Sequence, residues 1–516
     1  MATPKSTPSA NGLSRRRALG IAGIAAAGGA IGAGSLGVTP ALSAPPSAGA
    51  MTKAERAFLQ RGLRHAVWVA PDTPPRYVPT PAVVEAGGFN MPTFYDPDLY
   101  NAPLMNGLKD KTWSLAKAPF AQHILGPLDE SRPYFHDAQL QNIQNLFSVC
   151  FGDEEYYSDE LIQWLPRYFA KLREQAPDAL AHTNQWAGQW QDDQIRRYVA
   201  ALQPDMLTFD SYYYNTTTQR SYPGGSVTPL YNDTWRYRRL ALEGSDGKGN
   251  NPLVFGQYTL GYRTGTNQAL IGPRVLSETE IWLTSMLTWT LGGKWLNLFR
   301  WEWAPGDEHW LLNDANGNLT PQYSQYAALN GFMRNLSPYL VRLRTQGAGI
   351  VHGQMQSDSG SIVSTPAADI PRWSVETDPD TLLTGLKSVR GADANAGRPT
   401  DTVIGTFRPL PGLTKRERST WIPRPDTPFF MVLNASGFAK NNIEDRFSGG
   451  GESQSATHTV QLEFDLRGSN RSPNALRCFS PQDGSVRRVD LERVTSRQYV
   501  ATHTLAGAMG DLFFWE

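Results

Sequence analysis

A cluster of acids follows an apolar run in the first half of the chain. Residues 146–151 are apolar or small, and Gly152 then leads into three consecutive carboxylates, Asp153, Glu154 and Glu155. This pattern predicts a buried strand with acids at its tip. A pair of carboxylates can hydrolyse a glycosidic bond, one as a proton donor and the other as a nucleophile or base. Asp153 and Glu154 stand directly at the strand end and are the first candidates for this chemistry.

Similar side chains follow other apolar runs in the first two thirds of the chain. They are Asn184, Trp186, Asp210, Tyr212, Tyr213, Gln257, Trp301, Glu302 and Trp303. Amides and carboxylates can hydrogen-bond hydroxyl groups, and large rings offer flat apolar faces. This combination suits a carbohydrate better than a phosphorylated substrate. We therefore predict substrate contacts from Asp153, Asn184, Trp186, Tyr212, Tyr213, Gln257, Trp301 and Trp303.

Several other chemistries lack their sequence signatures. The chain contains no phosphate-binding Gly-Lys-Ser/Thr loop, no His-Glu-x-x-His zinc motif and no Gly-x-Ser-x-Gly nucleophile elbow. We accordingly predict no cofactor and no metal. The 48 basic residues balance the 48 acidic ones, so composition does not favour a nucleic-acid partner. The sequence does not predict an oligomeric state.

The candidate residues need a scaffold that brings strand ends together. Between residues 51 and 344, short apolar runs alternate with helical patterns, which predicts an α/β fold, a (β/α)8 TIM barrel. The eight predicted strands are 65–70, 89–95, 122–128, 146–151, 180–186, 205–213, 253–260 and 295–303. Catalytic side chains of such barrels lie at the C-terminal strand ends, where the candidates stand.

Local signals place some of the helices between these strands. Ser277 and Glu280 fit a capping box, and Thr320-Pro321 fits the start of a helix. Pro166 interrupts the helical stripe that follows the acids, so we expect a kink or a restart there.

The remainder of the chain has a different pattern. From residue 345 to residue 516, short β-type runs alternate with clusters of Gly, Pro, Asn and Ser, which predicts an antiparallel β-sandwich accessory domain. The clearest predicted strands are 361–365, 429–433, 459–466, 499–505 and 511–516.

The first fifty residues read as an export leader. Ser14-Arg15-Arg16-Arg17-Ala18-Leu19 precedes an uncharged run rich in Ala and Gly, a pattern typical of a bacterial twin-arginine signal peptide. The run is too rich in glycine for a stable membrane anchor. We therefore predict a protein that acts outside the cytoplasm. Cys150 and Cys478 lie in different predicted domains, and we expect both to be free thiols.

The barrel segment with its Gly-Asp-Glu tip, and the run DMLTFDSYY at residues 205–213, resembles the TIM-barrel glycoside hydrolases, above all the β-galactosidase-like clan with a C-terminal β-sandwich. The resemblance implies that Glu154 is the general acid/base. The clan usually has Asn before that Glu, where this chain has Asp153. It usually has its nucleophile at the end of strand seven, where this chain has Gln257.

Three alternatives could replace the carboxylate nucleophile that is missing from strand seven. Glu302 is our first choice of nucleophile or base, ahead of Asp210. In the third alternative, Gly152-Asp153-Glu154 is similar to the Gly-Asp-Glu of β-hexosaminidases, which implies attack by the substrate's own acetamido group. A non-catalytic carbohydrate-binding protein on a decayed barrel is the rival outside enzymes. In every enzymatic version Glu154 needs a raised pKa, and Asp153 is expected on the opposite face of the strand.

Overall fold

The computed structural model describes most of the chain after the predicted leader. The described residues are 50–69, 78–95, 100–116, 126–131, 134–214, 228–264, 272–301, 310–314, 316–356, 361–365, 367–375, 379–390, 400–418 and 421–516. The predicted leader, up to residue 49, lies outside them. None of the helices within these ranges has the length and apolar character that a membrane span requires.

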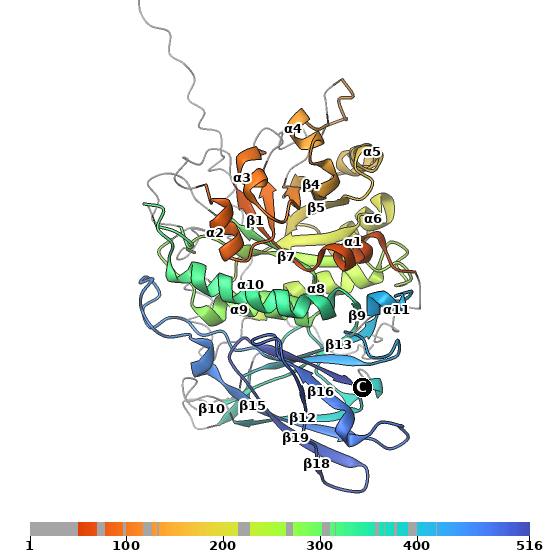
Figure 1. The fold of residues 1–516 in the computed structure, drawn as a ribbon, viewed down its shortest axis with the longest axis vertical. Coiled ribbons are helices and arrows are strands. Elements are labelled where there is room, and N and C mark those ends of the chain that lie inside the picture. The colour runs from red at the N-terminus through yellow and green to blue at the C-terminus, as the bar shows by residue number, and fades with distance from the viewer. Residues whose placement is uncertain are drawn as a thin grey trace, which may run out of the picture.

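Eight parallel strands close into a barrel in sequence order, and β1 pairs with β8 (Figure 1). The strands are β1 (Arg64–Val69), β2 (Met91–Phe94), β3 (Trp113–Leu115), β4 (Leu146–Asp153), β5 (Leu180–Trp186), β6 (Met206–Asp210), β7 (Val254–Leu260) and β8 (Trp295–Phe299). The prediction of a (β/α)8 barrel is confirmed.

Helices surround the barrel. They are α1 (Lys53–Arg61), α2 (Pro81–Ala86), α3 (Ala102–Gly107), α4 (Asp137–Leu140), α5 (Asp159–Gln175), α6 (Asp192–Leu202), α8 (Thr228–Glu243), α9 (Glu278–Thr290) and α10 (Pro321–Leu340), with a 3-10 turn η2 (Ile143–Asn145). The capping box of α9 forms between Ser277 and Glu280 as predicted, and Pro321 occupies the first turn of α10. These local signals were therefore sufficient to place both helix starts.

Two local predictions were wrong. The third strand is β3 at Trp113–Leu115, not residues 122–128, of which 122–125 are outside the described part of the chain. A strand of three residues is too short to show a periodic pattern. The expected break at Pro166 is also absent, since α5 continues through it. Pro166 is on the exposed side of α5, while Leu165 and Phe169 anchor the helix to the core.

Aromatic and polar side chains fill the interior of the barrel. The ring of Trp295 contacts His182 and Tyr258, with centroid distances of 5.7 and 5.2 Å. Burial lowers the pKa of His182 to about 3, so this histidine is neutral at physiological pH. His182 also shares a hydrogen bond of 2.9 Å with the hydroxyl of Thr208. These contacts fill part of the barrel interior with packed side chains.

The C-terminal part is a β-sandwich, as predicted. One sheet has the order β17-β16-β20-β14-β13-β9 and the other β12-β15-β19-β18, with a separate β10-β11 pair. The strands are β9 (Leu343–Val351), β10 (Gln354–Gln356), β11 (Ile362–Ser364), β12 (Leu383–Arg390), β13 (Thr402–Pro409), β14 (Phe429–Asn434), β15 (His458–Asp465), β16 (Leu476–Phe479), β17 (Val486–Arg488), β18 (Glu492–Arg493), β19 (Gln498–Leu505) and β20 (Gly510–Trp515). The short elements are η4 (Pro379–Thr381), α11 (Lys415–Arg418), η6 (Ser453–Ala456) and η7 (Pro473–Ala475).

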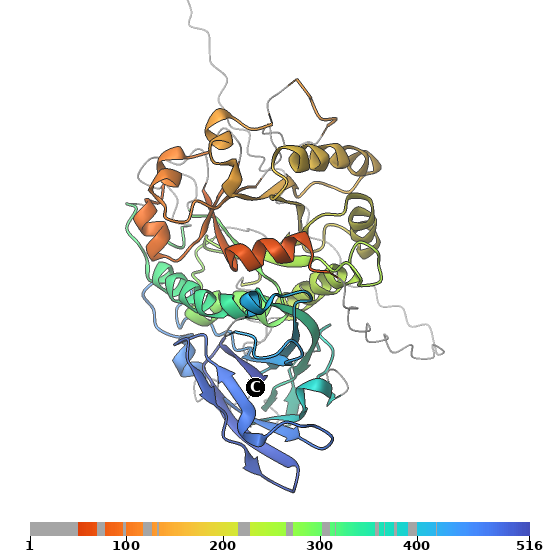
Figure 2. The same cartoon turned by 45° about the vertical axis from the view of Figure 1, so that its right-hand side comes forward.

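Helix α9 joins the two parts of the molecule. It contacts β7 of the barrel and β13 and β14 of the sandwich, which lies below α9 and α10 (Figures 1 and 2). All residues from Thr279 to Thr290 are buried, which explains why the apolar residues of this helix are not confined to one face. Gly405 of β13 permits this approach, since an added Cβ would lie 1.7 Å from the carbonyl oxygen of Thr290. The sandwich is thus packed firmly against the barrel.

Candidate active site

The backbone at the end of β4 departs from a regular strand. Gly152 and Glu154 have positive φ angles of 86° and 58°, and the pairing of β4 with β5 shifts between Cys150 and Asp153. A positive φ is unfavourable for a residue with a side chain, and such residues are concentrated at functional sites. The Glu154 N–H donates to the carbonyl oxygen of Asn184 at 3.0 Å, which fixes this conformation.

This irregular tip gathers three carboxyl groups. The Asn184 Nδ2 on β5 donates to Oδ1 of Asp153 at 3.3 Å and to Oδ1 of Asp210 on β6 at 2.8 Å. The Asp210 carboxyl in turn shares a hydrogen bond with that of Glu154. The expectation that Asp153 points away from Glu154 is therefore wrong, because the strand is not regular at this point. Three adjacent strands deliver Asp153, Glu154, Asn184 and Asp210 to one site.

Asp210 is the buried member of this cluster. Only 5% of its surface is exposed, and burial together with the charges of Glu154 and Asp153 raises the pKa of its carboxyl well above the ordinary value. Desolvation and like charges both disfavour ionisation, so Asp210 holds its proton more tightly than a solvated aspartate. A protonated Asp210 donates its hydrogen bond to Glu154. The two carboxyl groups thus form a pair that shares a proton.

The closeness of this pair bears on the roles of its members. A direct hydrogen bond holds the two oxygens about 2.5–3.0 Å apart. Retaining glycosidases separate their two catalytic carboxyl groups by roughly 5 Å, and inverting ones by roughly 6.5–9.5 Å. A carboxyl pair in direct hydrogen-bond contact leaves no room for a sugar between its members, which favours another residue than Asp210 as the second carboxylate.

Aromatic rings surround the carboxyl cluster. Tyr212, which follows β6, contacts Tyr262 at 5.2 Å and Phe299 at 6.2 Å between ring centroids. Burial and then the charge of Asp210 raise the pKa values of Tyr212 and Tyr262 well above the ordinary value. Burial also raises the pKa of Tyr258 on β7, with smaller contributions from the charges of Cys150, Asp153 and Asp210. The site therefore has an apolar wall beside its acids.

Two predicted substrate contacts lie elsewhere. Gln257 is fully buried, and its Nε2 donates to the hydroxyls of Thr234 on α8 and Thr288 on α9. The structure thus contradicts a substrate contact by Gln257, because alternate residues of a strand face opposite sides and the inward place belongs to Tyr258. Tyr213 is likewise buried beside α8, where burial and then the charge of Asp233 raise the pKa of its hydroxyl.

The predicted tryptophans differ in position. Trp186 ends β5 opposite Asp210, and its ring covers Gly188, where an added Cβ would lie 2.5 Å from the indole. Trp301 is buried, and its ring packs edge-on against Tyr323 of α10 at 6.1 Å, away from the carboxyl cluster. Glu302 and Trp303 lie outside the described residues, and their roles stay predictions.

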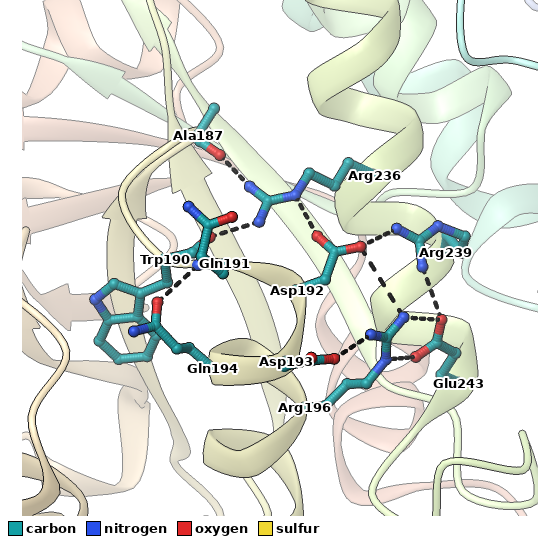
Figure 3. A network of polar contacts seen from close by, with 10 residues as sticks. All are labelled: Ala187, Trp190, Gln191, Asp192, Asp193, Gln194, Arg196, Arg236, Arg239 and Glu243. Carbon is teal, nitrogen blue, oxygen red and sulfur yellow. Dashed lines mark hydrogen bonds and ion pairs between the residues drawn. The ribbon is translucent and has the colours of Figure 1, made fainter. Parts of the chain in front are cut away.

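The loop between β5 and α6 supports the acidic tip from behind. The Gln189 side chain donates to the carbonyl oxygen of Glu154 at 2.6 Å, and the Trp190 indole donates to that of Glu155 at 2.8 Å. Arg236 of α8 holds this loop by donating to the carbonyl oxygens of Ala187 and Trp190 (Figure 3). A chain of hydrogen bonds therefore links α8 to the backbone that carries Glu154.

An ion-pair network extends this support outward (Figure 3). Asp192 accepts hydrogen bonds from Arg236, at 2.6 Å, and from Arg239, while Glu243 pairs with Arg239 and Arg196 at 2.9 and 2.7 Å. A hollow of about 390 Å³ borders the network, lined by Gly188, Gln191, Asp192, Asp193 and Arg236. Its Asp and Arg side chains are already paired with one another or with Arg196 and Arg239, so the network fastens α6 to α8.

No family model matches this sequence, and a search of curated proteins finds no match. Solved structures with a similar fold include TIM-barrel glycoside hydrolases. A glycoside hydrolase family 5 protein from Bacteroides vulgatus is 10% identical with a TM-score of 0.41, and the match covers 84% of each chain. An α-amylase from Geobacillus thermoleovorans is 10% identical with a TM-score of 0.40, over 90% of this chain and 99% of that one.

A β-galactosidase from Marinomonas ef1 also resembles the chain, at 10% identity and a TM-score of 0.36. The match covers 53% of this chain, which spans 60% of the length of that enzyme. The reaction has to be argued from the carboxyl cluster.

Proposed function

We propose that this protein is an exported glycoside hydrolase that cleaves O-glycosidic bonds of an oligosaccharide or polysaccharide, with Glu154 as its general acid/base. The observation that carries the proposal is the carboxyl cluster at the C-terminal end of the barrel. There, Glu154 shares a proton with the buried Asp210, and Asn184 orients the neighbouring carboxylates. A carboxylic acid that retains a proton can protonate the leaving-group oxygen of a sugar, and the neighbouring aromatic rings can pack against the sugar ring.

Each residue of the cluster would have a separate role in the reaction. The proton held by Asp210 passes across the shared hydrogen bond to Glu154, which donates it to the glycosidic oxygen as the bond to the anomeric carbon breaks. Asp210 keeps the proton within the pair until that step. Tyr212 and Tyr262 supply the apolar wall against which a sugar ring would pack.

A nucleophile or second base completes the reaction. Glu302 follows β8 by three residues, and we propose it for this role because Asp210 is bonded directly to Glu154. Replacement of Glu302 by Ala should abolish turnover of a natural substrate. External azide should then restore turnover with the opposite anomeric configuration if Glu302 is a nucleophile, because azide attacks from the vacated side.

A substrate-assisted reaction is the second candidate. It is favoured by the position of Asp153, which lies beside Glu154 and Asp210 instead of on the opposite face of the strand. In that reaction Asp153 would orient an acetamido group of the substrate, and Glu154 would remain the acid. The two candidates differ in a simple test: only the second requires an N-acetyl group and is inhibited by a thiazoline that mimics the cyclised intermediate.

Reducing-sugar release by the purified mature protein, measured across a panel of polysaccharides, tests the proposal. Glu154→Gln should lower release by roughly 100- to 10,000-fold. Glu160→Gln is the matched control, since Glu160 is exposed in the first turn of α5. Equal release by Glu154→Gln and the parent would remove Glu154 from the mechanism. Glycan retained by both, with no release by either, would favour a carbohydrate-binding protein.

The leader supports export through the twin-arginine pathway, which is part of the proposal. Lysine in place of Arg15, Arg16 and Arg17 keeps the positive charge and removes the paired arginines. The changed protein should accumulate in the cytoplasm while the parent is exported. Export of both to the same extent would contradict this route.

A further inference from the structure

Three side chains with metal-binding atoms converge in the sandwich, far from the carboxyl cluster in the fold. They are Cys478 on β16, His503 on β19 and Asp511 on β20, and their ligand atoms all lie within 4.8 Å of one another. His503 Nε2 and Asp511 Oδ2 are 2.8 Å apart, and Cys478 Sγ is 3.7 Å from the same carboxylate oxygen. In the part of the chain that the structure describes, no other group of His, Cys, Asp and Glu side chains has this spacing.

The three residues come from both sheets of the sandwich. Strands β16 and β20 are neighbours in the six-stranded sheet, whereas β19 belongs to the four-stranded one. The His503 ring packs edge-on against Phe513 at 5.0 Å, which limits its rotation. Cys478 is 7% exposed, and the side chains of His503 and Asp511 are 21% and 13% exposed. The cluster is therefore mostly shielded yet open on one side.

We propose that Cys478, His503 and Asp511 form a binding site for a zinc ion, or for a divalent ion of similar preference. A thiolate, an imidazole and a carboxylate are all zinc ligands, and three protein ligands leave the fourth position to water. Zinc bonds of about 2.0–2.3 Å at tetrahedral angles place ligand atoms roughly 3.3–3.7 Å apart. The sulfur and oxygen atoms already have that separation, and the His503–Asp511 pair would have to open by about half an ångström.

Charge is also consistent with a divalent ion. A divalent cation would replace the thiol proton and neutralise both the thiolate and the carboxylate, which leaves the site without net charge. Arg487 on β17 lies near the thiol and is itself paired with Asp483, so the surrounding charges are balanced. The bound metal would link the two sheets.

Cobalt(II) added to the purified mature protein gives a direct test, because a thiolate bound to cobalt has a charge-transfer absorption in the near ultraviolet. The parent should show this band, and zinc should displace it. Cys478→Ser should lose the band, while Cys150→Ser should keep it. Cys150 is the matched control, since it is a buried thiol on β4 of the barrel and the chain has two cysteines.

Thermal unfolding supplies the second measurement. Zinc should raise the Tm of the parent and of Cys150→Ser, and this increase should vanish in Asp511→Asn and His503→Gln. Near-ultraviolet circular dichroism of each variant checks that its sandwich is folded. A parent that shows neither the cobalt band nor a zinc-dependent Tm would overturn the proposal. An unchanged band in a folded Cys478→Ser variant would do the same.

Discussion

Replacement of Asp210 by Asn isolates the effect of its buried carboxyl group. The amide has nearly the same shape, and it can still donate to Glu154 and accept from Asn184, but it cannot ionise. Burial and the charges of Glu154 and Asp153 raise the pKa of Asp210 in the folded protein. In the unfolded chain an aspartate has a pKa of about 3.9.

The sign of the effect on stability follows from these two pKa values. Below about pH 3.9 Asp210 is protonated in both states, and its ionisation does not affect folding. As the pH rises toward the folded pKa, the unfolded chain releases a proton that the folded protein keeps, so the parent loses stability. The loss is about 1.4 kcal/mol for each pH unit in this window. The Asp210→Asn variant should not show this loss of stability, because Asn does not ionise.

Urea unfolding of parent and variant at several pH values between 4 and 7 measures the difference. The stability of Asp210→Asn relative to the parent should increase with pH at about 1.4 kcal/mol per unit, and level off above the folded pKa. Asp178→Asn makes the same change of carboxyl to amide at an exposed aspartate and is the matched control. A difference that is independent of pH in Asp210→Asn would refute the argument that Asp210 holds a proton.

Three further predictions concern the barrel and its junction with the sandwich. Arg344→Met should cost about 3–5 kcal/mol of unfolding free energy, because it removes the ion-pair partner of the buried Glu55, as urea unfolding would show. Arg236→Met should lower the unfolding free energy by about 1–3 kcal/mol, because it removes the hydrogen bonds that hold the loop behind Glu154. It should reduce kcat by a larger factor than it changes KM. The control Arg488→Met, at an exposed arginine, should cost less than about 1 kcal/mol. Gln257→Met should reduce stability without changing KM, and a large rise in KM would return that residue to the substrate site.

The barrel could be predicted because its strands and helix starts have strong local signals. The apolar run before Asp153 and Glu154 placed both acids at a strand end, and the capping box at Ser277 placed a helix. β3 was missed, since Trp113–Leu115 is too short for a pattern.

The details of the site depend on contacts between distant segments. The left-handed backbone at Glu154 and the shifted pairing with β5 determine on which face of β4 the Asp153 side chain lies. Neither feature has a clear sequence signal. All residues of β7 are buried, so its pattern does not distinguish the inward Tyr258 from the outward Gln257. The support from Arg236 joins α8 to a loop that lies about fifty residues earlier and has no local signature.

The central claim is tested most directly by how the kcat/KM of the Glu154→Gln variant depends on the leaving group of the substrate. A dinitrophenyl glycoside needs no protonation of its leaving group, while an alkyl glycoside of the same sugar does. If Glu154 is the general acid, the variant should lose roughly 100- to 10,000-fold in kcat/KM on the alkyl glycoside and far less on the dinitrophenyl glycoside. Equal losses on both substrates would contradict the assignment of Glu154 as the proton donor.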